Sequence, residues 1–312
     1  MEIDQKTIEW LLTGDPCVRW QVQRDLLDKK PAVYQQEQAK ITNEGWGKKL
    51  LSHQDPEGTW GGGLYSPKWI STTYTLLALR RLGLPSENEA AHQGCNLLLE
   101  RGFFEPDGGI NFSPNYKYSE TCITGMILSL LAYFSIPDKR IHRIANHLLV
   151  QQMVDGGWNC RSYLGDTHSS FHTTISALEG LLSYQTLYPD KNKKITAARE
   201  RAHEFLLQHK LYQSHRTGEV VKQQMTRFPF PPRWYYDFLR ALDYFQSAGA
   251  ERDQRFKDAV NLLISKQKNN GLWASYRGPS GRTFFELEPA GKPSRMNTLR
   301  ALRVLRWWDK GI

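Results

Sequence analysis

The chain has 312 residues, of which 40% are apolar, and it carries 10 Trp and a formal net charge of +9. Its Lys and Arg residues are spread along the chain without a basic arm or block, which argues against nucleic acid as a partner. The longest apolar stretch, residues 122–134, is too short to cross a bilayer, and the N-terminus shows no secretory signal, so we expect a cytoplasmic protein.

Two kinds of helix alternate along the chain. One kind has a single apolar stripe, as where Ile141, Ile144 and Leu148 recur at helical spacing. The other kind is apolar nearly all round, as in residues 171–187, and such helices are buried on most sides. In chain order, we expect amphipathic outer helices at residues 3–12, 33–53, 86–101, 139–152, 194–209 and 253–268. We expect buried inner helices at residues 16–27, 70–82, 119–134, 171–187, 233–245 and 294–308.

A repeat of about 50 to 60 residues runs through these helix pairs. A Leu pair closes most outer helices, at Leu50-Leu51, Leu98-Leu99, Leu148-Leu149, Leu206-Leu207 and Leu262-Leu263. A Gly-containing turn follows, and in three repeats this turn carries Trp60, Trp158 or Trp273. A period of this size indicates repeated supersecondary units that pack on one another.

The alternation of helix types predicts a closed double ring. An open solenoid would leave both kinds of helix half exposed and would need polar caps at its ends. The apolar last helix, residues 294–308, fits packing against the first helices better than it fits an exposed cap. We therefore expect a single domain over residues 1–312, an all-α, α/α-toroid with six inner and six outer helices around one cavity.

Three segments carry a family resemblance: HQDPEGTWGGG, QQMVDGGWNC and KQKNNGLWASY. They resemble the Q-x-x-x-G-x-W repeat of squalene and oxidosqualene cyclases, and they are similar to the Gly-Gly repeats of protein prenyltransferase β-subunits. The resemblance covers about 250 residues, from Leu50 to the C-terminus, and it implies a fold of the terpenoid-cyclase and prenyltransferase superfamily. It says much less about the reaction.

Long connections from outer to inner helices, such as residues 211–232 and 269–293, predict one rim where a ligand binds. The inner helices begin at this rim, and their N-terminal N–H groups favour an anion. Cations and aromatic side chains occur together in their first turns, which suits an apolar chain with an anionic head such as a diphosphate; the alternative is that the aromatic rings only seal the rim. The candidate substrate-binding residues are Arg19, Trp20, Trp69, Tyr118, Phe171, Arg233, Trp234, Tyr235, Arg295 and Asn297.

Acidic residues near the same rim are the candidates for catalysis. Asp237 follows the sequence PFPPRWYY, so a helix that begins at Arg233 would place it just past the first turn. Desolvation by aromatic neighbours would raise its pKa and make it a proton donor, whereas pairing with Arg233 would keep it ionised. The other candidates are Glu120, Glu286, with Glu288 beside it in the last long loop, and His172. The D-x-D-D and D-D-x-x-D motifs of terpenoid cyclases do not occur.

A zinc site is the alternative use of one short segment. Cys160, Asp166, His168 and His172 lie close in sequence and are zinc-ligand types. Protein prenyltransferases bind zinc at the corresponding rim, but their ligand pattern is not reproduced here. We expect no cofactor, with zinc or magnesium as the alternative. The four cysteines form no CxxC pair, which favours a reducing compartment.

Together these patterns predict an isoprenoid-active protein, cyclase-like, that binds a polyprenyl or terpenoid chain in an aromatic cavity, with proton-initiated cyclisation by Asp237 as its reaction. The second hypothesis is a carbohydrate-active hydrolase or lyase with two carboxyl groups facing each other across the ring. The third is a lipid-binding or scaffold toroid without catalysis. A face that docks on a membrane is left open.

Overall fold

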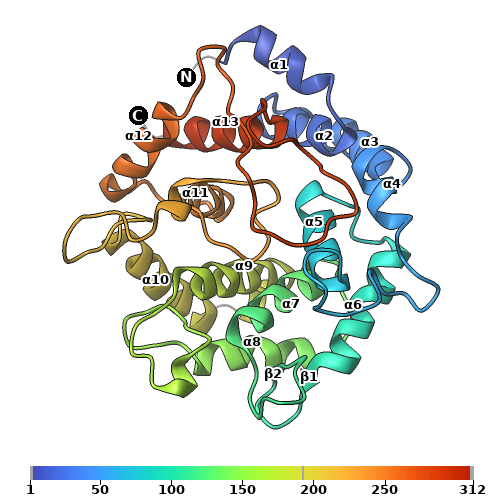
Figure 1. The fold of residues 1–312 in the computed structure, drawn as a ribbon, viewed down its shortest axis with the longest axis vertical. Helices are drawn as coiled ribbons and strands as arrows, with labels where there is room; N and C mark the ends of the chain where they lie inside the picture. The colour runs from blue at the N-terminus through green and yellow to red at the C-terminus, as the bar shows by residue number, and fades with distance from the viewer. Residues whose placement is uncertain (1–2, 192, 310–312) are drawn as a thin grey trace. The chain divides into compact units, whose positions relative to one another are not determined.

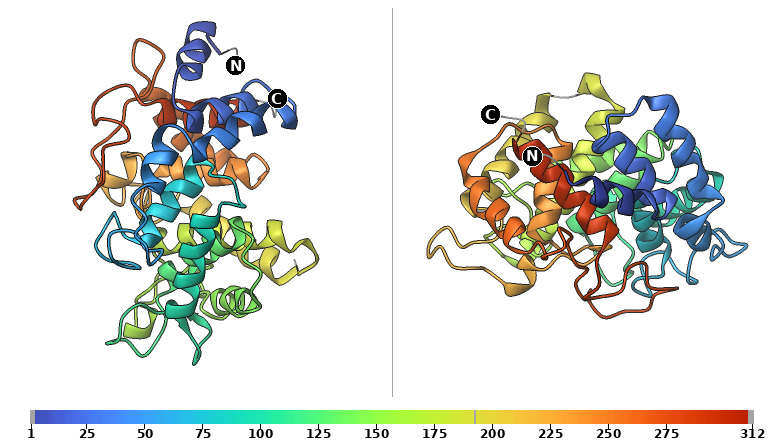
Figure 2. Two further views of the ribbon diagram at one scale, coloured as in Figure 1. Left: turned by 90° about the vertical axis from the view of Figure 1, so that its right-hand side faces the viewer. Right: turned by 90° about the horizontal axis from the view of Figure 1, so that it is seen from above.

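The computed structural model describes residues 3–191 and 193–309, and these form an all-α fold (Figures 1 and 2). The one sheet in the described residues is a two-stranded ribbon of β1 (Phe103–Phe104) and β2 (Gly109–Ile110). No described helix is both long enough and apolar enough to cross a membrane. The all-α class predicted from the sequence is confirmed, and buried helices alternate with amphipathic ones as predicted for an α/α-toroid.

The helices occur in the predicted order, and most of their bounds lie close to the predicted ones. The inner helices are α2 (Pro16–Asp25), α5 (Thr72–Leu82), α7 (Thr121–Tyr133), α9 (Phe171–Leu187), α11 (Phe238–Ser247) and α13 (Arg295–Asp309). The outer helices are α1 (Gln5–Leu12), α3 (Pro31–Ala39), α4 (Gly45–Leu51), α6 (Glu89–Gly102), α8 (Arg140–Val150), α10 (Lys193–Gln208) and α12 (Lys257–Ser265). Short 3-10 turns are η1 (Lys40–Thr42), η2 (Ser162–Leu164), η3 (Pro189–Lys191), η4 (Gln223–Thr226) and η5 (Gln254–Phe256).

The helix expected at residues 33–53 is broken into α3, η1 and α4, so that prediction is wrong. Gly45 adopts a φ of +59°, which an L side chain rarely takes. A Cβ at this position would lie 2.0 Å from Asp15 Oδ2, so the backbone approaches Asp15 too closely for any other residue. Asp15 Oδ2 accepts a hydrogen bond of 2.8 Å from the backbone N–H of Trp46 and thereby fixes the start of α4.

The described chain groups into two compact units. The first unit contains Met1–Ser52, Arg81–Pro85 and Gln208–Ile312, and the second contains His53–Arg80 and Ser86–Leu207. In the second unit α7 packs directly on α9, because Gly125 and Gly180 bring the two backbones together; a Cβ on Gly180 would lie 2.5 Å from the Gly125 carbonyl oxygen. In the first unit α13 contacts both α11 and α2.

The first unit also joins the two ends of the described chain. Arg303 of α13 donates hydrogen bonds to Gln21 Oε1 (3.0 Å) and Asp25 Oδ2 (3.1 Å) of α2. Arg295 donates to the backbone carbonyl of Trp10 in α1, at 3.2 Å. The predicted packing of the last inner helix against the first helices is therefore present, whereas one cavity enclosed by the entire ring stays a prediction.

The repeated Gln, Gly and Trp residues form the same small module three times. The side-chain amides of Gln54, Gln152 and Gln267 donate to the carbonyls of Gly58 (3.0 Å), Gly156 (2.7 Å) and Gly271 (2.8 Å). The backbone N–H groups of the buried residues Trp60, Trp158 and Trp273 donate to Thr hydroxyls on the next inner helix, at Thr72 (3.1 Å), Thr174 (3.0 Å) and Thr298 (3.1 Å). Each module thus ties the turn after an outer helix to the following inner helix.

We expect Thr174→Val to lower the free energy of unfolding by ~1–3 kcal/mol, because it leaves the buried Trp158 N–H without its acceptor. Thr186→Val is the matched control on the same helix, since Thr186 is exposed and its hydroxyl binds only the Leu182 carbonyl, at 3.0 Å. Urea unfolding followed by circular dichroism measures both. Equal effects of the two substitutions would show that the module does not stabilise the fold.

Candidate functional site

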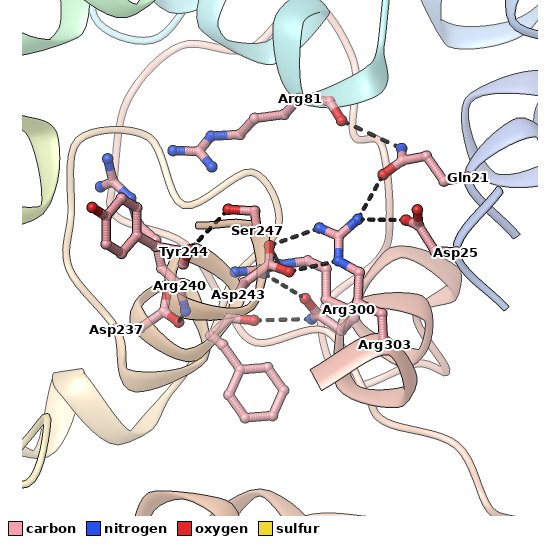
Figure 3. A network of polar contacts seen from close by, with 12 residues as sticks. Gln21, Asp25, Arg81, Asp237, Arg240, Asp243, Tyr244, Ser247, Arg300 and Arg303 are labelled. Carbon is pink, nitrogen blue, oxygen red and sulfur yellow. Dashed lines mark hydrogen bonds and ion pairs between the residues drawn. The ribbon is translucent and has the colours of Figure 1, made fainter. Parts of the chain in front are cut away.

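Asp237 is the most deeply buried of the predicted acids. It is the N-cap residue of α11, only 2% exposed, and its Oδ1 accepts a hydrogen bond of 2.7 Å from the backbone N–H of Arg240 (Figure 3). Its second oxygen, Oδ2, is also buried and has no hydrogen-bond partner among the described residues. A carboxyl held by one oxygen, with the other oxygen free, is suited to carry a proton.

The expected helix start at Arg233 is wrong, because α11 begins at Phe238. Residues 233–236 form a turn in which Arg233 has a φ of +57° and the Tyr235 N–H donates to the Pro232 carbonyl at 3.1 Å. The Tyr236 hydroxyl holds this turn in place by donating to the Leu211 carbonyl at 2.6 Å. Arg233 is therefore not one helical turn before Asp237, and the helical pair predicted between them does not form.

Burial raises the pKa of Asp237 above its ordinary value, although Arg300, Arg240 and Arg81 act in the opposite direction. Two of these arginines are bound elsewhere. Arg240 Nη1 donates to the Tyr235 carbonyl at 2.8 Å, and Arg300 Nη1 donates to Asn297 Oδ1 at 3.1 Å. The positive charges thus lower the pKa of Asp237 less than burial raises it.

A second acid on α11, Asp243, whose side chain is 13% exposed, has the opposite electrostatics (Figure 3). Arg303 donates from Nε to Asp243 Oδ1 at 2.6 Å and from Nη2 to Asp243 Oδ2 at 2.7 Å. Arg300 Nε lies 3.3 Å from Asp243 Oδ2. Burial alone would raise the pKa of Asp243, but Arg303 and Arg300 together hold it below its ordinary value. The N-cap of α11 therefore has a carboxyl with a raised pKa, and the helix itself has one with a lowered pKa; acid–base sites use pairs of this kind.

Several predicted substrate-binding residues of the first unit have structural partners. Arg19 forms an ion pair with Glu37, at 2.6 Å, and donates to the Gly14 carbonyl. Trp20 is buried and donates to the Leu82 carbonyl at 2.9 Å. Arg295 lies over the ring of Trp10, with 4.5 Å to its centroid. These contacts explain the positions of all three side chains, and no bound ligand is needed to explain them.

Three other candidates of the first unit lie in the turn before α11 and in the first turn of α13. Trp234 and Tyr235 stack with ring centroids 4.0 Å apart in the turn before α11. Asn297 is fully buried, and its side-chain amide donates to the carbonyls of Phe228 (2.9 Å) and Ala274 (3.3 Å). Since Asn297 also accepts from Arg300, it links the loops before α11 and α13 to the charged network.

The candidates of the second unit lie at the starts of its inner helices. Trp69 is buried with its ring edge on Tyr74, at a centroid distance of 4.8 Å. Phe171 begins α9 and packs on Phe205. Half-buried Tyr118 contacts the tilted ring of Tyr163, with 3.6 Å between the ring centroids. These aromatic residues are therefore packed against other aromatic rings of the unit.

Glu120 of the second unit occupies the N-cap position of α7, and its side chain makes no capping hydrogen bond. Burial raises its pKa, and the charge of Lys68 lowers it in part. Glu120 is thus a second carboxyl with a raised pKa.

The two acids of the last long loop differ in their burial and partners. Glu286 is exposed and accepts only a long hydrogen bond, 3.4 Å, from the Ala290 N–H. Glu288 is buried and accepts from the Ser294 hydroxyl and from the Met296 N–H (3.1 Å) at the start of α13. Glu288 therefore caps a helix, a role that its loop position in the sequence did not reveal.

The zinc candidates do not come together as a ligand set. Within the described residues, no group of three or more His, Cys, Asp or Glu side chains is placed to hold a metal ion. His168 is exposed, and Asp166 accepts from Arg161 at 3.2 Å. His172 lies in the first turn of α9, and Cys160 is in contact with Cys122 instead.

No protein-family model matches the chain, and no curated protein matches it. Similar solved structures include the type II terpene cyclase MstE from Scytonema in its apo form, with 16% sequence identity and a TM-score of 0.47 over 96% of this chain and 90% of that chain. A variant of that cyclase with geranylgeranyl dihydroxybenzoate as substrate has 18% identity and a TM-score of 0.44, over 94% and 86% of the two chains. A variant with merosterolic acid A as product has 14% identity and a TM-score of 0.35, over 89% and 97%. These likenesses do not assign an activity to this chain.

Proposed function

We propose that this chain is an isoprenoid-active protein of the terpene-cyclase kind, in which Asp237 is the general acid that protonates the substrate. The observation that carries the proposal is the state of this carboxyl, which is buried and has one oxygen fixed by the Arg240 N–H and the other without a protein partner. Burial raises its pKa, so it keeps its proton at a higher pH than an exposed Asp does.

The surroundings of Asp237 suit both sides of such a proton transfer. Protonation of an alkene forms a C–H bond and leaves a carbocation on the substrate and a carboxylate on Asp237. The positive charges of Arg300 and Arg240 favour that carboxylate once it forms. The faces of aromatic rings stabilise cations, and the stacked Trp234 and Tyr235 lie three and two residues before the acid.

The proposal concerns the apolar part of the substrate. A diphosphate head would need cations that are not already bound, and two members of the predicted basic rim, Arg19 and Arg295, have partners within the first unit. Alkene protonation by Asp237 uses no metal or organic cofactor. A lipid carrier with the same fold would bind the same compounds and leave them unchanged.

The experiment is incubation with squalene, with prenyl diphosphates and with geranylgeranyl dihydroxybenzoate, the compound bound in the similar structure described above. Native mass spectrometry measures binding, and chromatography with mass spectrometry measures products. We expect a product of unchanged mass in water, which gains one solvent deuterium in deuterium oxide because Asp237 exchanges its proton with solvent. Failure to bind any of these compounds at high concentration would contradict the proposal, and binding without turnover would support the carrier instead.

A further inference from the structure

Two cysteines of the second unit are in direct contact. Cys122 lies in the first turn of α7, and Cys160 lies in the loop between α8 and α9. The backbone N–H of Cys122 donates to Cys160 Sγ at 3.0 Å, so the two residues are in contact. Both cysteines are free and only half-buried, whereas Cys17 and Cys95 are fully buried.

The surroundings of the two sulfurs are unequal. Cys160 Sγ accepts from the Cys122 N–H at a helix N-terminus and from the Thr173 hydroxyl at 3.5 Å. The hydrogen bonds from Cys122, with that from Thr173, lower the pKa of Cys160 although burial and the charge of Glu120 oppose them. The pKa of Cys122 is raised, first by the neighbouring Cys160 side chain and then by burial. One sulfur is thus favoured as a thiolate and the other as a thiol.

We propose that Cys122 and Cys160 form a redox-active dithiol, in which Cys160 attacks peroxides and Cys122 then closes a disulfide. The contact between the two residues, their intermediate burial and the donors around Cys160 carry this inference, which is independent of the activity proposed for Asp237.

The chemistry proceeds in two balanced steps. The Cys160 thiolate attacks one peroxide oxygen, so that an S–O bond forms, the O–O bond breaks and the second oxygen leaves as hydroxide or alkoxide, which takes up a proton. The Cys122 sulfur then attacks the sulfenic acid on Cys160, so that the S–S bond forms and the hydroxyl group leaves as water with the Cys122 proton. Two electrons pass from the two thiols to the peroxide, and an external dithiol reverses the change by thiol–disulfide exchange.

The test is oxidation of the folded, reduced protein with hydrogen peroxide, followed by intact mass spectrometry and peptide mapping. We expect the wild type to lose the mass of two hydrogen atoms and to yield one cross-linked peptide that joins Cys122 to Cys160. Cys122→Ser should trap the sulfenic acid, which dimedone labels at Cys160. Cys160→Ser should react with peroxide at about one tenth of the wild-type rate or below, because the remaining half-buried thiol, that of Cys122, has a raised pKa.

Thr173→Val is a matched variant that removes one donor to Cys160 and should slow the first step about threefold. A comparison that needs no variant uses the wild type in native buffer and in urea, where Cys160 should react faster in the native protein. The proposal is overturned if native Cys160 reacts no faster than the unfolded chain, if Cys160→Ser consumes peroxide at the wild-type rate, or if the wild type forms sulfinic acid in place of the disulfide.

Discussion

Asp237→Asn is expected to lose turnover by ~100-fold or more while it keeps its fold and its ligand binding. Asn has no proton of suitable acidity to donate. Its side-chain oxygen can still accept the hydrogen bond from the Arg240 N–H, because Asn is as good an N-cap residue as Asp. The measurement is the rate of product formation under saturating substrate, with binding followed separately by native mass spectrometry.

The pH dependence of stability provides a check that does not need a substrate. Because the pKa of Asp237 is raised in the folded state, its contribution to stability is complete below the ordinary pKa of Asp and is lost as the pH rises through the folded-state pKa. The Asn variant has no such loss, so its stability relative to wild type should increase over this pH range. Asp237→Ala is the matched control, which should lose ~1 kcal/mol with the cap. Normal turnover by Asp237→Asn would leave Asp237 a capping residue only.

Much of the helix pattern was predictable because burial repeats with the period of the helix. The amphipathic stripe of Ile141, Ile144 and Leu148 is buried as expected, and α7 and α9 are buried on nearly all sides. The start of α11 was placed too early because Pro232 favours the first position of a helix. Asp237, a strong N-cap residue, marks the true start of the helix.

The charged network of the first unit was not predicted, although the sequence contains a sign of it. Arg300 and Arg303 are charged residues within a helix that was expected to be buried, and Asp243 is a charged residue within α11. Buried charges are found in pairs, so these residues predict partners, but helical periodicity does not say which helices meet. The same limit explains Arg19 and Arg295, whose partners Glu37 and Trp10 come from other helices.

Asp243→Ala is expected to lower the free energy of unfolding by ~3–5 kcal/mol, because it leaves two buried guanidinium groups without their shared carboxylate. The side chain of Arg300 is only 3% exposed, and Asp25 is the other acid that Arg303 contacts. Asp258→Ala is the matched control in the same unit, since its ion pair with Lys210 is exposed to solvent and should contribute little to stability.

The effect of Asp243→Ala should also depend on pH, with the sign opposite to that for Asp237. Because the pKa of Asp243 is lowered in the folded state, its contribution to stability is complete above the ordinary pKa of Asp and is lost as the pH falls through the folded-state pKa. Urea unfolding at neutral and at acid pH should therefore show a difference from wild type that shrinks in acid. A neutral-pH effect no larger than that of Asp258→Ala would mean that the attraction of Asp243 to Arg303 and Arg300 only offsets the cost of burying it.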